Sequence, residues 1–305
     1  MDEISGFTKC GRYKVFDKVV DGGMGSIHRA KDDKGGLVAL KFIHPEYAMN
    51  KGLRRRFGRE MDCGVELIDS SFFANVFGEV RIRDSLGDDR IGFAMEYLPG
   101  EDLFDFLWRV RTLSDEETFK SVGGICLTLD EAHKKGIVHR DVKLENVRLV
   151  RDGGLSLLDF GIAKVVGGFG GIRGGFEENY FRSVEKRSNR MRQITRLGTV
   201  FGSRDYVSPE VWRGNPADIR SDLYSLGVVL YVAIAGVTPF YTRNTWEARN
   251  CHLYRIPVPP NDRSVRKLSP SLLEDVCLKL LSKNPDHRYD SGVEVKVAMA
   301  KALKR

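Results

Sequence analysis

The most informative segment of this chain is Val138-His139-Arg140-Asp141-Val142-Lys143-Leu144-Glu145-Asn146. Two short apolar runs of strand-like character follow it, Val147–Val150 and Leu155–Leu158, and the second run ends at Asp159-Phe160-Gly161. Either acidic motif alone occurs often by chance. Both motifs together, separated by the length of a two-stranded hairpin, indicate one chemical site.

Strand-like patterns precede this segment, and helical patterns surround and follow it. The clearest strand-like runs are Arg12–Phe16, Leu37–Ile43 and Ile91–Met95. One helical run, Arg54 to Ile68, interrupts them and places apolar side chains three and four residues apart, at Phe57, Met61, Val65 and Ile68. A hinge is predicted at Leu98–Asp102. The helices expected beyond it are Asp115–Lys135, Asp218–Ala235, Ser269–Ser282 and Asp290–Leu303. Ser114 and Glu117 form a capping box at the start of the first of these helices.

A glycine-rich turn and a strand lysine occupy the N-terminal part. The turn is Asp21-Gly22-Gly23-Met24-Gly25-Ser26-Ile27, and glycines let a backbone approach phosphate closely, although such a turn is more often only a hairpin. Lys41 ends the apolar run Val38-Ala39-Leu40 and needs an anionic partner if it faces a core. Glu60 in the following helix is the predicted partner. The alternative is that both side chains are simply solvated.

In this order, the segments resemble the eukaryotic-type protein kinase family over nearly the whole chain. Ser208-Pro209-Glu210, Arg220–Gly227, Thr238-Pro239-Phe240 and Asn284–Tyr289 match later motifs of that family. The resemblance implies that Asp222 braces the backbone of the 138–146 segment and that Arg288 pairs with Glu210. It also implies an α+β, bilobal fold in one kinase domain over residues 1–305. A small β-rich lobe with one main helix would cover about residues 11–98, a larger helical lobe residues 99–305, and a long activation segment residues 159–210.

The resemblance assigns roles to the polar residues of the site. Asp141 would accept the proton of a substrate hydroxyl, and Lys143 would neutralise the γ-phosphate as it transfers. Lys41, paired with Glu60, would hold the phosphates of ATP. Asn146 and Asp159 would bind Mg²⁺, or Mn²⁺ in its place, through the oxygen ligands that such ions prefer.

The resemblance also implies a set of ATP contacts drawn from both lobes. The glycine-rich turn would cover the phosphates, the backbone at Glu96 and Leu98 would meet adenine, and Asp102 would meet the ribose. The full set is Asp21, Gly22, Gly23, Met24, Gly25, Ile27, Ala39, Lys41, Glu96, Leu98, Asp102 and Arg148.

Several positions indicate the branch of the family and its control. Lys143 and the small pair Gly202-Ser203 favour Ser/Thr specificity, and Phe160–Lys164 resembles bacterial eukaryotic-like Ser/Thr kinases. Arg140 stands beside the catalytic aspartate, where it could read a phosphate in the activation segment. Thr195 is the first candidate for that phosphate and Thr199 the second.

Three positions depart from the family pattern. Val20 replaces the first glycine of the turn, Arg148 replaces an apolar side chain beneath adenine, and Gly64 replaces an apolar residue one helical turn after Glu60. These departures keep a pseudokinase scaffold open as an alternative. A small-molecule phosphotransferase of the antibiotic-kinase type is a second alternative, which Ser208-Pro209-Glu210 disfavours.

Composition excludes several other classes of protein. The chain has 305 residues and a net charge of +7. Its five cysteines are scattered along the sequence, so we expect reduced thiols rather than disulfides or a zinc site. The apolar run Leu226–Val237 is too short to span a membrane, and no leader is recognisable, so we expect a cytoplasmic protein. Expected partners are ATP, protein substrates with Ser or Thr, and a transient homodimer for trans-autophosphorylation, but not nucleic acid.

Overall fold

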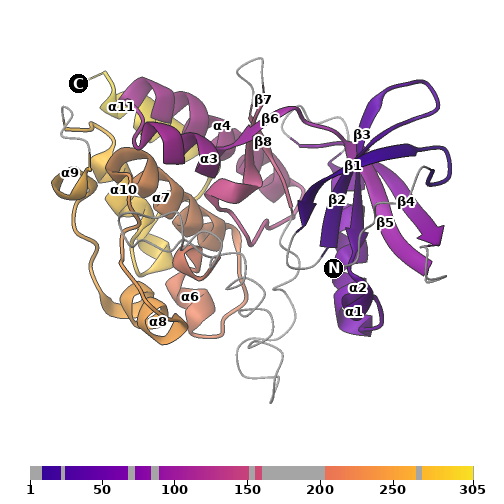
Figure 1. The fold of residues 1–305 in the computed structure, drawn as a ribbon. Helices are drawn as coiled ribbons and strands as arrows, with labels where there is room; N and C mark the ends of the chain where they lie inside the picture. Colours follow the sequence, from indigo (N-terminus) through magenta and orange to yellow (C-terminus); the bar gives the residue numbers. More distant parts are fainter. Residues whose placement is uncertain are drawn as a thin grey trace. The chain divides into compact units, whose positions relative to one another are not determined.

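The computed structural model describes residues 9–21, 25–67, 73–83, 89–150, 155–159, 203–265 and 270–304. The chain forms two compact units, Met1–Pro99 and Gly100–Arg305 (Figure 1). The first unit is mainly β-structure and the second mainly helical, as the α+β expectation requires.

The first unit is built on a five-stranded antiparallel sheet in the order β1-β2-β3-β5-β4. Its strands are β1 (Lys14–Asp21), β2 (Gly25–Lys31), β3 (Leu37–Ile43), β4 (Val76–Arg83) and β5 (Asp89–Glu96). The runs predicted at Leu37–Ile43 and Ile91–Met95 are therefore confirmed as strands. Because β3 is the central strand, most of its side chains are buried, and Leu40 and Phe42 belong to the core.

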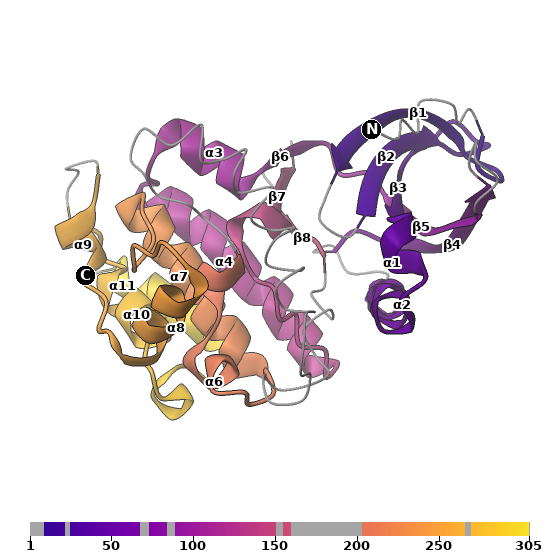
Figure 2. The same ribbon diagram turned by 60° about the horizontal axis from the view of Figure 1, so that its bottom comes forward.

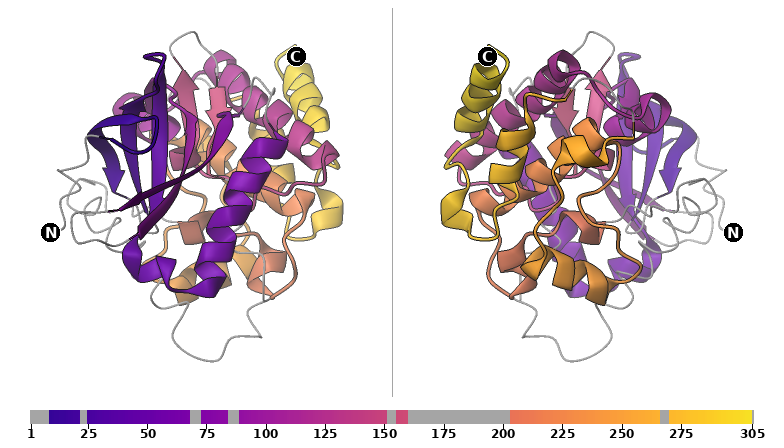
Figure 3. Two further views of the ribbon diagram at one scale, coloured as in Figure 1. Left: turned by 90° about the vertical axis from the view of Figure 1, so that its right-hand side faces the viewer. Right: turned by 90° about the vertical axis from the view of Figure 1, so that its left-hand side faces the viewer.

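Two helices accompany this sheet, α1 (Pro45–Ala48) and α2 (Lys51–Glu66) (Figure 3). The predicted apolar stripe of α2 is partly confirmed, because Phe57 is buried and its ring lies 5.1 Å from that of Phe93 on β5. Val65 is 45% exposed, so its predicted place on the stripe is wrong. Ile68 lies outside the described residues.

The second unit is organised around two long helices, α4 (Asp115–Lys134) and α7 (Ile219–Ala235), which pack against each other (Figure 2). The capping box of Ser114 and Glu117 is present at the start of α4. Nearly every side chain of α7 is buried, and from Leu226 to Ala235 its sequence is apolar on all sides apart from the hydroxyl of Tyr231. Among the described residues, the other helices of this unit are α3 (Leu103–Val110), α6 (Pro209–Trp212), α8 (Thr245–Tyr254), α9 (Pro260–Arg263), α10 (Glu274–Leu280) and α11 (Gly292–Ala302).

A small sheet and short 3₁₀ turns also occur in the described part of the second unit. The sheet has the order β6-β7-β8, formed by Gly100–Asp102, Val147–Val150 and Leu155–Leu157, so the predicted hairpin is present. The 3₁₀ turns are η1 (Leu144–Asn146), η3 (Ser203–Tyr206) and η4 (Pro285–His287). Within the described residues, no helix is both long and apolar enough to cross a membrane.

One helix begins later than its sequence pattern predicts. The run Ser269–Ser282 was expected to be helical, but α10 begins at Glu274. Tertiary contacts hold the preceding residues out of the helix, because the Ser271 hydroxyl and the Leu272 amide both donate to the carboxylate of Asp115, at 2.6 and 2.9 Å. At the last helix, Ser291 is the N-cap, so α11 begins at Gly292 rather than Asp290.

Candidate active site

The predicted partner of Lys41 is confirmed in the first unit. The Lys41 Nζ lies 2.6 Å from Oε1 of Glu60, and both side chains are largely buried. Lys41 extends from the central strand β3, where its neighbours across the sheet are Ile27 and Phe93. A rigid strand and a helix thus hold a paired ammonium group, which is the arrangement needed to position a phosphate ligand without leaving a lone buried charge.

Gly64 determines how closely α2 approaches the sheet. A Cβ atom on Gly64 would lie 2.2 Å from Cγ2 of Val76 on β4, a separation at which atoms clash. Gly64 stands one turn after Glu60, so the close packing it permits also sets the position of the Glu60 carboxylate. The departure from the family pattern at Gly64 is therefore compensated by Val76, which fills the space.

The part of the glycine-rich turn within the described residues is tightly packed. A Cβ atom on Gly25 would lie 2.1 Å from the carbonyl oxygen of Phe42, so a larger residue at this position would push β2 away from β3. Val20 and Asp21 belong to β1, and Val20 pairs with Ile27. Gly22, Gly23 and Met24 lie outside the described residues.

In the second unit, Asp222 of α7 holds the backbone of the segment before Asp141. Its carboxylate accepts hydrogen bonds from the amides of His139 at 2.8 Å and Arg140 at 2.7 Å. These two bonds fix a strained turn, since Arg140 has a positive φ of 68°. The predicted brace is confirmed.

His139 links this turn to the end of the β-hairpin. Its Nδ1 accepts from the amide of Asp141 at 3.3 Å, so Nε2 carries the proton and donates to the carbonyl of Leu158 at 3.1 Å. The ring is fully buried, and burial lowers the pKa of His139, which keeps the imidazole neutral. Leu158 in turn donates its amide to the carbonyl of Asn146 at 2.7 Å. The backbone immediately before Asp159 is thereby tied to the loop.

Asp141, Lys143 and Asn146 form a compact polar cluster. The Lys143 Nζ lies 2.5 Å from Oδ2 of Asp141, and both side chains are mostly buried. The Asn146 Nδ2 donates to the backbone carbonyl of Asp141 at 2.8 Å and to its Oδ2 at 3.3 Å. A carboxylate held by an ammonium and an amide has a defined orientation, which a proton acceptor needs.

The contacts of Asn146 also indicate which of its side-chain atoms could bind a divalent cation. Because Nδ2 of Asn146 is committed to Asp141, its Oδ1 is the end that could ligate a cation. Asp159 has a positive φ of 57°, uncommon for a residue other than glycine and found often at functional sites. No cluster of three or more His, Cys, Asp or Glu side chains suited to a metal occurs among the described residues. One amide oxygen and one carboxylate fit Mg²⁺, which usually completes its shell with phosphate and water.

The small sheet places the residues predicted to meet the ribose and the base. Arg148 on the middle strand β7 stands opposite Asp102 on β6 and Ser156 on β8. Asp102 caps α3 by accepting from the Asp105 amide at 2.8 Å through Oδ1. In the first unit, Glu96 accepts from the Asn75 side chain at 3.0 Å, so its adenine contact would come from the backbone.

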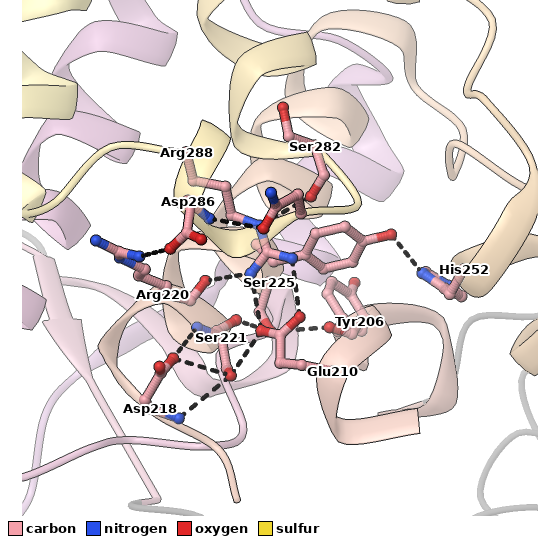
Figure 4. A network of polar contacts seen from close by, with 12 residues as sticks. Tyr206, Glu210, Asp218, Arg220, Ser221, Ser225, His252, Ser282, Asp286 and Arg288 are labelled. Carbon is pink, nitrogen blue, oxygen red and sulfur yellow. Dashed lines mark hydrogen bonds and ion pairs between the residues drawn. The ribbon is translucent and has the colours of Figure 1, made fainter. Parts of the chain in front are cut away.

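A buried ion pair supports the segment that ends in Ser208-Pro209-Glu210. Arg288 donates from Nη1 and Nη2 to the two carboxylate oxygens of Glu210, at 2.8 and 2.9 Å (Figure 4). Burial alone would raise the pKa of Glu210, but the hydrogen bonds and positive charge of Arg288, together with hydrogen bonds from the backbone and Ser221, lower it overall. Ser221 adds a third hydrogen bond to the carboxylate at 2.8 Å. The predicted pairing of Arg288 with Glu210 is confirmed.

The sequence analysis did not identify His133, a further residue that contacts the carboxylate of Asp222. The Nε2 of His133, in the last turn of α4, lies 2.9 Å from Oδ2 of Asp222. The sequence signal that could have identified it is its position, in the last turn of the helix and a short loop before His139. His133 therefore joins α4 to α7 at the base of the loop.

The remaining residues predicted to control activity belong to the segment after Asp159. Phe160, Gly161, Thr195, Thr199 and Gly202 lie outside the described residues.

Comparisons with known proteins give a consistent result. The model of the protein kinase domain family matches residues 13–296. A probable serine/threonine-protein kinase of Clostridium perfringens is 30% identical over 286 residues, which are 93% of this chain and 37% of that protein. Serine/threonine-protein kinase pkn3 of Myxococcus xanthus is 31% identical over 98% of this chain and 51% of its own length. PknB of Mycobacterium leprae is 30% identical over 93% of this chain and 42% of its own length. The chain thus spans about half, or less, of these relatives.

Proposed function

The chain belongs to the protein kinase family, and from this premise we propose that it transfers the γ-phosphoryl group of ATP to Ser and Thr hydroxyls of proteins. The observation that carries the proposal is the orientation of Asp141 by Lys143 and Asn146, at 2.5 and 3.3 Å from its Oδ2. A scaffold protein would have no need to maintain an oriented, mostly buried carboxylate beside an ammonium group.

Each polar residue of the proposed active site has a role in this reaction. Asp141 accepts the proton of the attacking hydroxyl and orients its oxygen toward phosphorus. Lys143 stabilises the negative charge that the transferring group carries, and Lys41, held by Glu60, positions the phosphates. Asn146 and Asp159 would hold Mg²⁺ or Mn²⁺, which supplies charge neutralisation at the phosphates.

The second unit keeps this cluster rigid. Asp222 holds the backbone of His139 and Arg140, and neutral His139 connects that backbone to Leu158, next to Asp159. Such preorganisation lowers the cost of aligning the hydroxyl with the phosphate. In our proposal the remaining ATP contacts are those predicted from the sequence, including Gly25, Ala39 and Arg148, and a transient homodimer phosphorylates Thr195.

Preference for Ser and Thr over Tyr rests on two supports. Lys143 is the residue that the resemblance associates with Ser/Thr kinases, and the relatives from Clostridium perfringens and Myxococcus xanthus carry that name.

Phosphoamino-acid analysis tests this preference. The protein would be incubated with Mg²⁺, ATP labelled in the γ-phosphate and a generic protein substrate, and the product would be hydrolysed to its amino acids. We expect label in phosphoserine and phosphothreonine. Label confined to phosphotyrosine would contradict the proposed specificity, and label on an added small alcohol but not on protein would indicate a small-molecule phosphotransferase.

A further inference from the structure

The outer face of α8 carries large apolar side chains that the catalytic cluster does not use. Trp246 is 73% exposed, Tyr254 is 70% exposed, and Ile256, just beyond the helix, is 83% exposed. Single exposed apolar residues are common, but three so fully exposed within one short segment mark an interaction surface. Figure 1 shows α8 at the margin of the second unit, next to α6.

Helix geometry places Trp246, Asn250 and Tyr254 on one side of α8. Trp246, Asn250 and Tyr254 follow each other at intervals of four residues, and exposed Arg249 stands beside them. Ala248, Cys251 and His252 are buried on the opposite side of the helix, and Leu253 is buried between the column of Trp246 and Asn250 and the exposed Arg249. Packing against the rest of the unit therefore fixes the helix and leaves the Trp246–Tyr254 face outward.

Positive charge accompanies this face. Arg243, Arg249 and Arg255 are all exposed. The single acidic residue of the segment, Glu247, accepts a hydrogen bond from the Arg243 amide at 2.8 Å. Burial lowers the pKa of His252 to about 3, so that histidine adds no charge near neutral pH. Tryptophan, tyrosine and arginine are the residues most enriched at protein-binding surfaces.

We propose that the face formed by Trp246, Arg249, Tyr254, Arg255 and Ile256 binds an acidic polypeptide segment that carries two large apolar side chains. The apolar side chains would cover Trp246 and Tyr254, and the acidic ones would meet the arginines. Trp246 and Tyr254 are eight residues apart, about 12 Å along a helix. An extended peptide covers that length in about four residues, so its two apolar anchors would be four positions apart.

A binding measurement tests the proposal without any catalytic readout. The probe is a fluorescein-labelled peptide, Glu-Phe-Glu-Glu-Glu-Phe-Glu, which has no hydroxyl to be phosphorylated, and binding to the full chain is followed by anisotropy. We expect saturable binding that weakens with added salt. The fluorescence of exposed Trp246 should also become less accessible to acrylamide. A peptide with Lys in place of every Glu should bind at least about tenfold more weakly.

Matched variants localise the site. Trp246→Ala, and separately the double variant Arg249→Gln with Arg255→Gln, should each weaken binding at least about tenfold, as loss of an anchor residue does. Met49→Ala removes an exposed apolar side chain of the first unit, and Lys301→Gln removes an exposed charge on α11, so both should bind like the wild type. Unchanged far-ultraviolet circular dichroism would show that each variant is folded.

Three results would overturn the proposal. The first is absence of saturable binding, and the second is equal binding of the Glu and Lys peptides. The third is self-association of the protein that Trp246→Ala abolishes, because it would assign the face to a second copy of the chain. Loss of phosphoryl transfer would not affect the outcome, since the peptide is not a substrate.

Discussion

The carboxylate of Asp222 accepts a hydrogen bond of 2.7 Å from the backbone amide of Arg140, although the two residues are 82 positions apart. This hydrogen bond connects the buried carboxylate of Asp222, on the mostly buried helix α7, to the strained residue directly before the proposed catalytic base. The position of Asp141 therefore depends on a contact that no substrate touches.

Replacing Asp222 with Asn should disturb both stability and turnover. The new amide would present a donor to a backbone donor, so we expect a loss of about 2–3 kcal/mol in the free energy of unfolding. Displacement of Asp141 should lower kcat by roughly tenfold to a hundredfold. Denaturant unfolding and initial-rate kinetics measure the two effects. Asp218→Asn, at the N-cap of the same helix, is the control and should cost less than about 0.5 kcal/mol.

Two glycines of α2 should respond oppositely to the same substitution. Gly64→Ala places a methyl group within 2.2 Å of Val76, so it should destabilise the protein by about 1–3 kcal/mol and weaken the link between Lys41 and Glu60. Gly58→Ala meets nothing within 4 Å and should stabilise the helix by about 0.5–1 kcal/mol. Thermal unfolding compares them directly. A similar shift in both variants would show that α2 does not depend on close packing at Gly64.

The pair formed by Glu210 and Arg288 should show strong coupling. Arg288→Met leaves a buried carboxylate without its counterion, so we expect a loss of about 3–5 kcal/mol. The double variant with Glu210→Met should lose less than the sum of the two single variants, because the unpaired charge is then absent. A double-mutant cycle from urea unfolding gives the coupling energy. Additive losses would mean that the two side chains act independently.

Acid should destabilise the protein through its buried histidines. Burial lowers the pKa of His252 to about 3, from an ordinary value near 6.5. Between pH 6.5 and 3, the His252 side chain is therefore protonated in the unfolded chain but not in the folded chain. The contribution of neutral His252 to the free energy of unfolding is present above pH 6.5 and is lost as the pH falls toward 3. His252→Asn should reduce the slope of stability against pH in this window, while exposed His287→Asn should not. An unchanged slope for His252→Asn would be inconsistent with a buried neutral ring.

Local motifs made much of the site predictable. The roles of Asp141, Asn146 and Asp222 were inferred from short motifs, and the hydrogen bonds that join these motifs are present in the structure. The partner of Lys41 could be proposed because a strand, a lysine and a helix follow one another closely. Such contacts lie within or between regular elements, where spacing in the sequence determines direction.

Contacts between distant segments limited the prediction elsewhere. The start of α10 was missed because Ser271 bonds to Asp115, 156 residues earlier, and no local pattern contains that contact. Val65 was expected to be buried on periodicity alone, but the helix turns it toward solvent. Gly64 departs from the family pattern in the sequence, and only the structure shows that the Val76 side chain fills the space beside it.

Single-turnover transfer of the labelled γ-phosphate of ATP to a protein substrate, compared between the wild type and Asp141→Asn, tests the account most directly. We predict transfer by the wild type and a rate about 10²–10⁴-fold lower in the variant, with ATP binding and thermal stability retained. Equal labelling by the two proteins would contradict the role of Asp141. Absence of labelling by the wild type, despite ATP binding, would contradict phosphoryl transfer itself.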